Sequence, residues 1–154
     1  GMCGQLAQLN GNNGFIFYGR DDDDQTFRAK TAGDVNGDGI KDFVVAAWTA
    51  DGENGDKSNA GEVYVVFGKA SPWDAWMTAD SLNGANGFIF YGNNENDQAG
   101  SGFSSGDVNG DGYSDIIIAA PGADVGGKEN VGQVHVIFGK ATVWPVSITN
   151  SYIQ

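Results

Sequence analysis

Two acidic stretches of nine residues contain the side chains best suited to binding a metal ion. The first begins at Asp34 and reads Asp-Val-Asn-Gly-Asp-Gly-Ile-Lys-Asp, so side-chain oxygens occupy its first, third, fifth and ninth positions. Gly39 at the sixth position permits a sharp reversal of the backbone, and Ile40 at the seventh can offer its carbonyl oxygen. Oxygen ligands at this spacing are typical of a Ca²⁺ loop. The predicted ligands are Asp34, Asn36, Asp38, Ile40 and Asp42.

The second stretch begins at Asp107, 73 residues after the first, and keeps the same pattern with Gly112 at its sixth position. Three carboxylates drawn within a few ångströms repel one another strongly unless a cation lies among them. The sequence therefore predicts two Ca²⁺ sites in the chain and no further cofactor. The ligands predicted for the second site are Asp107, Asn109, Asp111, Tyr113 and Asp115.

Two other interpretations of these stretches are weaker. Helix-flanked calcium loops, such as EF-hands and dockerins, need an acid at position 12, where this chain has Val45 and Ile118. They also need a helix after the loop, whereas apolar strands are expected here. Clusters of Asp, Asn and Gly can also be plain hairpin turns, but two copies of one ligand pattern favour the metal site.

A tandem repeat positions both stretches. The heptapeptide Asn-Gly-Phe-Ile-Phe-Tyr-Gly occurs at 13–19 and again, letter for letter, at 86–92. A third block at 61–70 is matched at 132–141, so the second copy has lost two residues between the acidic stretch and this block. We therefore treat residues 1–154 as a single module of two units. Unit one covers about residues 13–85, and unit two covers about residues 86–154.

Short strands are the elements expected to hold the acidic stretches. Residues 43–47 and 116–120 are continuously apolar, which indicates strands buried on both faces of a sheet. No helical pattern of the length that a parallel α/β sheet needs lies between them, so an all-β fold is predicted. The expected strands, beside a spare one at 13–19, span 26–32, 42–47, 62–67, 87–91, 101–105, 115–120 and 133–138.

The chain resembles the FG-GAP repeat of integrin α-subunit β-propellers and of large bacterial surface and secreted proteins. The acidic loops, the strand Gly-Glu-Val-Tyr-Val-Val-Phe-Gly-Lys at 61–69 and the heptapeptide carry the resemblance, which covers about residues 6–144. It matches the bacterial variants best. The resemblance implies β-propeller blades of four antiparallel strands, two blades per chain, with Ca²⁺ held by the ten residues named above.

Charge and composition narrow the function. The chain has 20 acidic and 8 basic residues, a formal net charge of −12, which argues against binding nucleic acid. No apolar run is long enough for a membrane span, so no membrane insertion is expected. The single cysteine, Cys3, excludes an intrachain disulfide, and the single histidine, His135, excludes a multi-histidine metal site.

The predicted function is a calcium-binding propeller module for extracellular adhesion or for binding a protein or glycan ligand, with calcium in a structural role. An extracellular or cell-surface location is expected, with any signal segment outside this chain. Two alternatives are the scaffold of a calcium-dependent lyase or hydrolase acting on polysaccharide, and a lectin in which Trp76 contacts sugar. No nucleophile–base pair is evident, so no catalytic residue is predicted.

The remaining polar and aromatic residues are assigned packing or solvent roles. The acidic run at 21–24 is expected to be a solvated loop rather than another cation site. Trp73 and Trp144 recur at equivalent positions of the repeat, which favours packing over ligand contact. His135 lies within a predicted strand and is expected to be a packing or surface residue.

The order of the strands predicts a homo-oligomer. Unit two lacks its outer strand, whereas residues 13–19 supply a spare copy of it. Exchange of this strand between protomers would give six blades in a trimer or eight in a tetramer, and we expect the trimer, unless the chain is part of a longer propeller.

Overall fold

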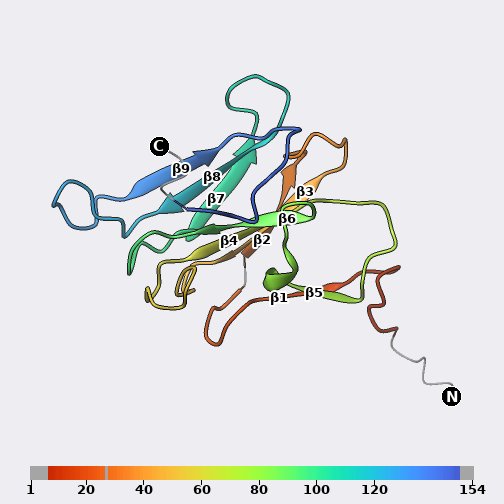
Figure 1. The fold of residues 1–154 in the computed structure, drawn as a ribbon, viewed down its shortest axis with the longest axis horizontal. Coiled ribbons are helices and arrows are strands. Elements are labelled where there is room, and N and C mark those ends of the chain that lie inside the picture. The colour runs from red at the N-terminus through yellow and green to blue at the C-terminus, as the bar shows by residue number, and fades with distance from the viewer. Residues whose placement is uncertain (1–6, 27, 150–154) are drawn as a thin grey trace, which may run out of the picture.

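The computed structural model describes residues 7–26 and 28–149. In this part of the chain there are ten strands and one short 3₁₀ helix, arranged in three sheets (Figure 1), which confirms the all-β prediction. No helix in the described residues is long and apolar enough to cross a membrane. The elements are β1 (Ile16–Tyr18), β2 (Arg28–Gly33), β3 (Asp42–Ala47), β4 (Glu62–Val66), β5 (Trp76–Thr78), η1 (Ala79–Ser81), β6 (Gly87–Tyr91), β7 (Gly102–Gly106), β8 (Asp115–Ala120), β9 (Gln133–Ile137) and β10 (Ser147–Ile148).

The first sheet has the strand order β10-β6-β4-β3-β2. Its four long strands are antiparallel neighbours, with Tyr64 paired to Val45 of β3 on one side and to Ile89 of β6 on the other. Every residue of β4 and of β6 is buried. The central strands are thus covered on both faces, as their continuous apolar sequence requires.

The second sheet repeats this arrangement with three strands in the order β7-β8-β9. It has no fourth strand among the described residues. The strand that precedes it in sequence, β6, carries the heptapeptide of unit two but pairs with β4 of unit one. The sequence repeat and the sheets are therefore out of phase.

Two short strands, β5 and β10, were not predicted. Each pairs in parallel with a copy of the heptapeptide strand, β5 with β1 and β10 with β6. The two pairings have the same register, because Ile16↔Trp76 in the first is the repeat copy of Ile89↔Ser147 in the second. Strands of two or three residues are too short to show an alternating pattern in the sequence.

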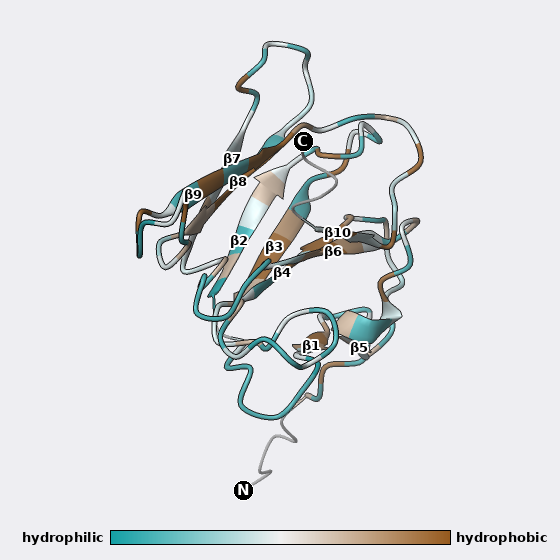
Figure 2. Cartoon of the chain, turned by 60° about the vertical axis from the view of Figure 1, so that its left-hand side comes forward, coloured by the Kyte–Doolittle hydropathy of each residue, from teal (hydrophilic) through white to brown (hydrophobic). Residues whose placement is uncertain are grey.

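Two apolar cores lie on the two faces of the first sheet, which Figure 1 shows between the second sheet and the β1–β5 pair. Val44, Val63 and Phe88 pack toward the second sheet, where Ile116 and Ile118 meet them. The opposite face packs against β1 and β5, and this core contains Val45, Tyr64, Ile89, Phe17 and Met77. Figure 2 shows the hydrophobic segments concentrated in strands such as β3, β6 and β8.

The packing roles predicted for two tryptophans and the histidine are confirmed. The Trp144 ring stacks on Phe88 with 4.6 Å between ring centroids, and Trp73 stacks on Phe15, the repeat copy of Phe88, at 4.5 Å. His135 is buried beside Phe90. This burial lowers the pKa of His135, and the carboxylate of Asp97 opposes the shift.

Most of the predicted strands have ends that match the structure or differ by one or two residues, but the spare strand predicted at 13–19 is shorter, because β1 begins at Ile16 and ends at Tyr18. The first expected strand, 26–32, begins at Arg28 in the structure, Thr26 lies outside it, and residue 27 is outside the described residues. The continuously apolar strands at 42–47 and 115–120 have the predicted bounds.

Candidate metal centre

Each acidic stretch forms the loop between the first two strands of a sheet. The first loop begins directly after β2 and ends at Asp42, the first residue of β3, and the second joins β7 to β8 in the same way. Asp42 pairs with Gly33 and Asp115 pairs with Gly106, so the strands bring the two ends of each loop together. Gly39 has φ of 84°, a left-handed conformation that favours glycine at this position.

The first carboxylate organises the turn of each loop. Asp34 Oδ1 accepts hydrogen bonds from the backbone N–H groups of Gly37 at 2.7 Å and Asp38 at 3.1 Å, and its Oδ2 accepts one from Gly39 at 2.8 Å. Asp107 accepts the equivalent three bonds at 2.7, 3.1 and 2.9 Å. The two loops therefore have the same internal geometry.

The fifth position is exposed in both loops, whereas the third is half-buried in the first loop and exposed in the second. Asn36 Nδ2 donates to Asp38 Oδ2 at 3.1 Å, and Asp38 Oδ1 accepts the backbone N–H of Ile40 at 2.8 Å. Asn109 and Asp111 repeat the first of these contacts at 2.9 Å. The carboxylates of Asp38 and Asp111 are exposed, so solvent or a cation can reach them.

The ninth carboxylate is buried in both loops and ties three strands together. Asp42 Oδ2 accepts the N–H of Val35, just after β2, at 2.7 Å, and its Oδ1 accepts the N–H of Gly68, just after β4, at 2.7 Å. Asp115 makes the same two bonds, to Val108 and Gly139. The ligand spacing did not predict this role in fastening the strands.

The electrostatics of Asp42 reflect both its burial and its charged neighbour. Burial raises the pKa of its carboxyl, the N–H donors of Gly68 and Val35 lower it, and the nearby Asp38 raises it again. Asp38 and Asp42 therefore repel each other across the loop. A cation between them would relieve this repulsion.

The donor set of each loop fits a hard cation in its chemistry. It contains three carboxylates, an amide oxygen and a backbone carbonyl, and an oxygen that accepts one hydrogen bond retains a lone pair for a metal. The carboxylates are turned toward backbone N–H groups, and the described residues contain no group of three or more His, Cys, Asp or Glu side chains arranged to hold a metal ion. The structure thus collects the predicted residues in two matching loops without converging them on one point.

The first loop also lies at the contact between the two sheets. The carbonyl of Asp34 accepts the N–H of Ser114 at 2.8 Å, and the carbonyl of Val35 accepts the N–H of Lys140 at 2.9 Å. Both donors belong to unit two. A change in the conformation of the first loop would therefore alter its hydrogen bonds to the second unit.

A second polar cluster was not predicted from the sequence. Glu62 on β4 is buried, and its carboxylate lies 3.2 Å from Nη1 of Arg20 and accepts a bond of 2.9 Å from the Tyr64 hydroxyl. Arg20 also donates to the Tyr91 hydroxyl at 2.8 Å. Because Arg20 lies two residues after the end of β1, the cluster fastens this end of β1 to the first sheet. An acid at the start of an apolar strand was the only sequence signal for it.

Burial raises the pKa of Glu62 to about 7, and the Arg20 guanidinium and the Tyr64 hydroxyl oppose the shift. The carboxyl thus changes its charge in the neutral pH range, in contact with the residue that holds β1.

The acidic run at 21–24 is solvated only in part. Asp21, Asp22 and Asp23 are exposed as expected, but Asp24 is buried, which corrects the prediction for this residue. Its Oδ2 accepts the N–H of Asp21 at 2.9 Å and closes a tight turn. Asp97, its repeat copy, is buried and makes the same bond to Asn94.

Comparison with known protein families agrees with the fold. Residues 99–137 match the family model of the FG-GAP repeat. The matched segment contains β7, β8 and β9 with the second acidic loop between the first two of them. No curated protein gives a significant match to the chain. Residues 99–137 are therefore similar to an FG-GAP repeat, and unit one repeats the strands and loop of this segment.

The fastening role of Asp42 predicts a loss of stability on Asp42→Asn. An asparagine can accept one of the two bonds with its oxygen but turns an NH₂ group toward the other N–H, leaving a buried donor unpaired, at a cost of about 1–3 kcal/mol. Chemical denaturation in the absence of metal would measure this loss in the free energy of unfolding. Asp38→Asn, which alters an exposed carboxylate of the same loop, serves as the control. Equal stability of the two variants would contradict the buried role of Asp42.

The raised pKa of Glu62 predicts a specific pH dependence. Between its usual value of 4.5 and about 7, the folded chain binds more protons at this group than the unfolded chain, so its contribution to stability falls as pH rises through that window. The stability of the wild type relative to Glu62→Gln should drop by about 1–3 kcal/mol from about pH 5 to about pH 8.

Urea unfolding of both proteins across this range would measure the difference. Glu95→Gln, which removes an exposed carboxyl, controls for the change in net charge. A difference that stays constant with pH, or grows with it, would refute the assignment.

Proposed function

We propose that the chain is a calcium-stabilised binding module built from FG-GAP β-propeller blades, acting outside the cell or at its surface. In this proposal the first sheet is one complete blade of four antiparallel strands and the second sheet is a blade with three of its strands. Two Ca²⁺ ions per chain have a structural role. The module binds a protein or glycan ligand and has no chemistry of its own.

One observation carries the proposal. The same nine-residue oxygen-rich loop occurs twice, at the same place between the first two strands of a sheet, and the second copy lies within the segment that matches the FG-GAP repeat. In both copies the last acid of the loop, Asp42 or Asp115, joins the ends of three strands. A cation in each loop would hold in place the strand ends that the last acid of the loop joins.

The ten loop residues named above would supply the ligands. Asp34, Asn36 and Asp38 would turn side-chain oxygens toward the ion, and the carbonyl of Ile40 and one Asp42 oxygen would complete the set of ligands. The second loop would do the same. Bound Ca²⁺ would cancel the repulsion between the carboxylates. Affinities of roughly 10⁻⁴–10⁻³ M, usual for extracellular modules, are expected.

Two features support a binding module that works outside the cell. The net charge of −12 disfavours nucleic acid as the ligand, and the segment 99–137 matches the FG-GAP repeat, which is typically extracellular. Nothing in the described residues favours the alternative of a polysaccharide-acting enzyme over a binding role.

Calcium should stabilise the protein, and chelation should destabilise it. At a hundredfold excess of Ca²⁺ over the dissociation constant, each filled site adds about 2.7 kcal/mol, so the melting temperature should rise by several degrees and fall again with EDTA. Titration calorimetry should give two sites, and Asp38→Ala or Asp111→Ala should each remove about one. Asp56→Ala, an exposed acid outside both loops, is the control. Indifference to both Ca²⁺ and EDTA would exclude the metal sites.

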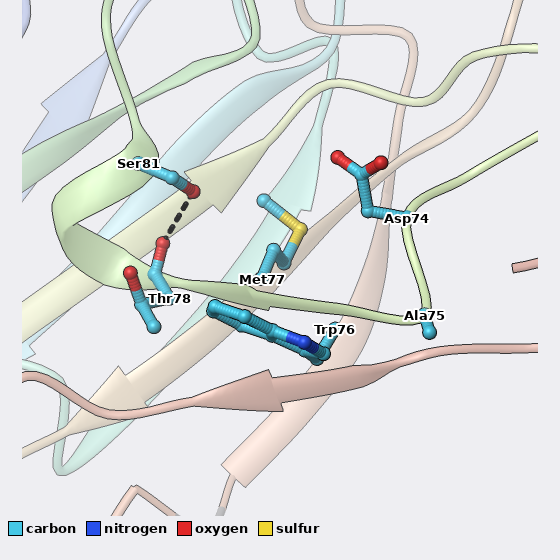
Figure 3. Close-up of a pocket in the computed structure, with 6 residues that line it drawn as sticks. All are labelled: Asp74, Ala75, Trp76, Met77, Thr78 and Ser81. Carbon is cyan, nitrogen blue, oxygen red and sulfur yellow. Dashed lines mark hydrogen bonds between the residues drawn. The ribbon is translucent and has the colours of Figure 1, made fainter. Parts of the chain in front are cut away.

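Glycan binding is the second candidate, and an exposed aromatic side chain favours it. Trp76 lines a pocket of about 390 Å³ together with Asp74, Met77, Thr78 and Ser81 (Figure 3). Its ring is exposed, and the Tyr18 ring lies edge-on to it at 6.5 Å. An exposed indole can stack on the apolar face of a sugar ring, and Asp74, which lines the same pocket, can accept hydrogen bonds from hydroxyl groups.

If this pocket binds glycans, neutral oligosaccharides of glucose or galactose should quench the tryptophan fluorescence. Trp76→Phe should abolish the quenching while calorimetry still detects binding, because an aromatic face remains. Trp76→Ala should abolish binding itself. Unchanged quenching in Trp76→Ala would place any sugar site elsewhere.

A further inference from the structure

Two strand edges lack the neighbours that their repeat copies have. In the described residues, β1 pairs with β5 alone, whereas its copy β6 has β10 on one edge and β4 on the other. Likewise β9 pairs with β8 alone, whereas its copy β4 has both β3 and β6. The edge that is open on β1 is the one with which β6 binds β4. The edge that is open on β9 is the one with which β4 binds β6.

The side chains around these edges show the same deficit. Five residues that are at most 7% exposed in and around the first sheet have repeat copies that are 42–65% exposed. These side chains are large and apolar, so their exposure marks missing contacts rather than ordinary surface. The buried members are Val35, Val63, Phe67, Ile89 and Tyr91, and their exposed copies are Val108, Val134, Phe138, Ile16 and Tyr18 respectively.

The exposed copies form two patches. Val108, Val134 and Phe138 lie on the outer side of the second sheet, because their buried counterparts belong to the core between the two sheets or lie beside it. Ile16 and Tyr18 lie on β1. Both views of the chain show the first sheet between β9 and β1 (Figures 1 and 2), so one chain cannot join its own two open edges.

We propose that the open edge of β9 in one copy pairs with the open edge of β1 in a second copy, antiparallel and head to tail. The inference rests on the proposed repeat module. The first sheet supplies the register, in which Glu62 pairs with Tyr91 and Val63 with Phe90. Translated through the repeat, Gln133 of one copy pairs with Tyr18 of the next, and Val134 pairs with Phe17.

We assign the open edge of β9 to β1 of a second protein molecule because the same strand sequence already occupies the equivalent edge within the chain. The seven residues that contain β1 are identical to those that contain β6, and β6 occupies the equivalent edge of β4 within the chain. The incoming strand also matches the patches, since Ile16 would take the position of Ile89 and Tyr18 that of Tyr91.

The strand β1 can pair with a second protein molecule without leaving its place in its own molecule. It is held by the pairing with β5, by the packing of Phe17 against Tyr64 at 5.6 Å and by the Arg20 cluster that follows it. These contacts use one edge and one face of β1 and leave its other edge available. The contact is therefore heterologous, and it forms a closed ring if the rotation between copies closes.

Light scattering on a sizing column in millimolar Ca²⁺ tests the proposal directly. We expect a mass that is a multiple of 16.1 kDa, with three or four copies for a closed ring. A mass of 16.1 kDa at every soluble concentration would overturn the pairing.

Val134→Lys should weaken the association by at least tenfold, because it places a charge at a position whose copy is fully buried. Its exposure in the single copy means that folding should be unaffected. Val143→Lys makes the same chemical change at an exposed loop position away from both open edges and should leave the mass unchanged. An oligomer unaffected by Val134→Lys would also overturn the proposal.

A cysteine pair tests the register itself. Directly opposed residues of antiparallel strands have Cα atoms about 4.5–5.5 Å apart, within disulfide range, whereas a pair displaced by two residues lies beyond it. In a Cys3→Ser background, Gln133→Cys combined with Tyr18→Cys should cross-link copies under mild oxidation. Gln133→Cys combined with Ile16→Cys should not. Equal cross-linking by the two pairs would contradict the register.

Failure of this proposal can be told apart from failure of the calcium proposal. The Val134→Lys protein should still melt at a higher temperature with Ca²⁺ than with EDTA, because both loops are intact. A monomeric wild type that Ca²⁺ stabilises would overturn only the pairing. An oligomeric wild type that ignores Ca²⁺ would overturn only the metal sites.

Discussion

The structure depends on one constraint: strands that are apolar on both faces must be covered on both faces. The first sheet satisfies it because the second sheet packs on one side and the β1–β5 pair on the other. The second sheet and the β1–β5 pair therefore each share a core with the first sheet, and neither encloses a separate core. The tryptophans follow from the same constraint. Trp144 and Trp73 each extend a core by stacking on a phenylalanine of a heptapeptide strand.

Polar groups in this fold are concentrated where strands end, and there they define the geometry that packing leaves open. A strand that is apolar on both faces can change register without placing a polar side chain in the core, but a buried carboxylate with two fixed N–H donors cannot move without losing its hydrogen bonds. Asp42 and Asp115 thus set the relation between three strand ends in each sheet. Arg20 and Glu62 do the same for β1. Asp42, Asp115 and Glu62 are all buried, so the charge of each carboxyl group depends on how the sheet packs around it.

Much of this arrangement could be predicted from the sequence, for identifiable reasons. The strands at 42–47 and 115–120 were predictable because five consecutive apolar residues permit few alternatives, and the loops because two copies share one ligand spacing. The parallel strands β5 and β10 could not be predicted, because the neighbours that stabilise them are distant in sequence. The burial of Glu62 and Asp24 was missed for the same reason: their partners come from other elements or from turn geometry that residue types alone do not specify.

The phase difference between the sequence repeat and the sheets has a consequence for how such a chain can grow or shrink. Because β6 lies in the second sequence unit but completes the first sheet, and β10 returns to that same sheet, a cut at the unit boundary would remove strands from a sheet on the other side of it. Neither unit is thus a self-contained piece that recombination could move alone. Insertion of one whole unit would, however, add a fourth strand to the second sheet, which has three strands in the described residues, and would begin a new sheet in turn. A gene of this kind can lengthen by duplication at any point of its period without inventing a new junction, because every junction is already present inside it.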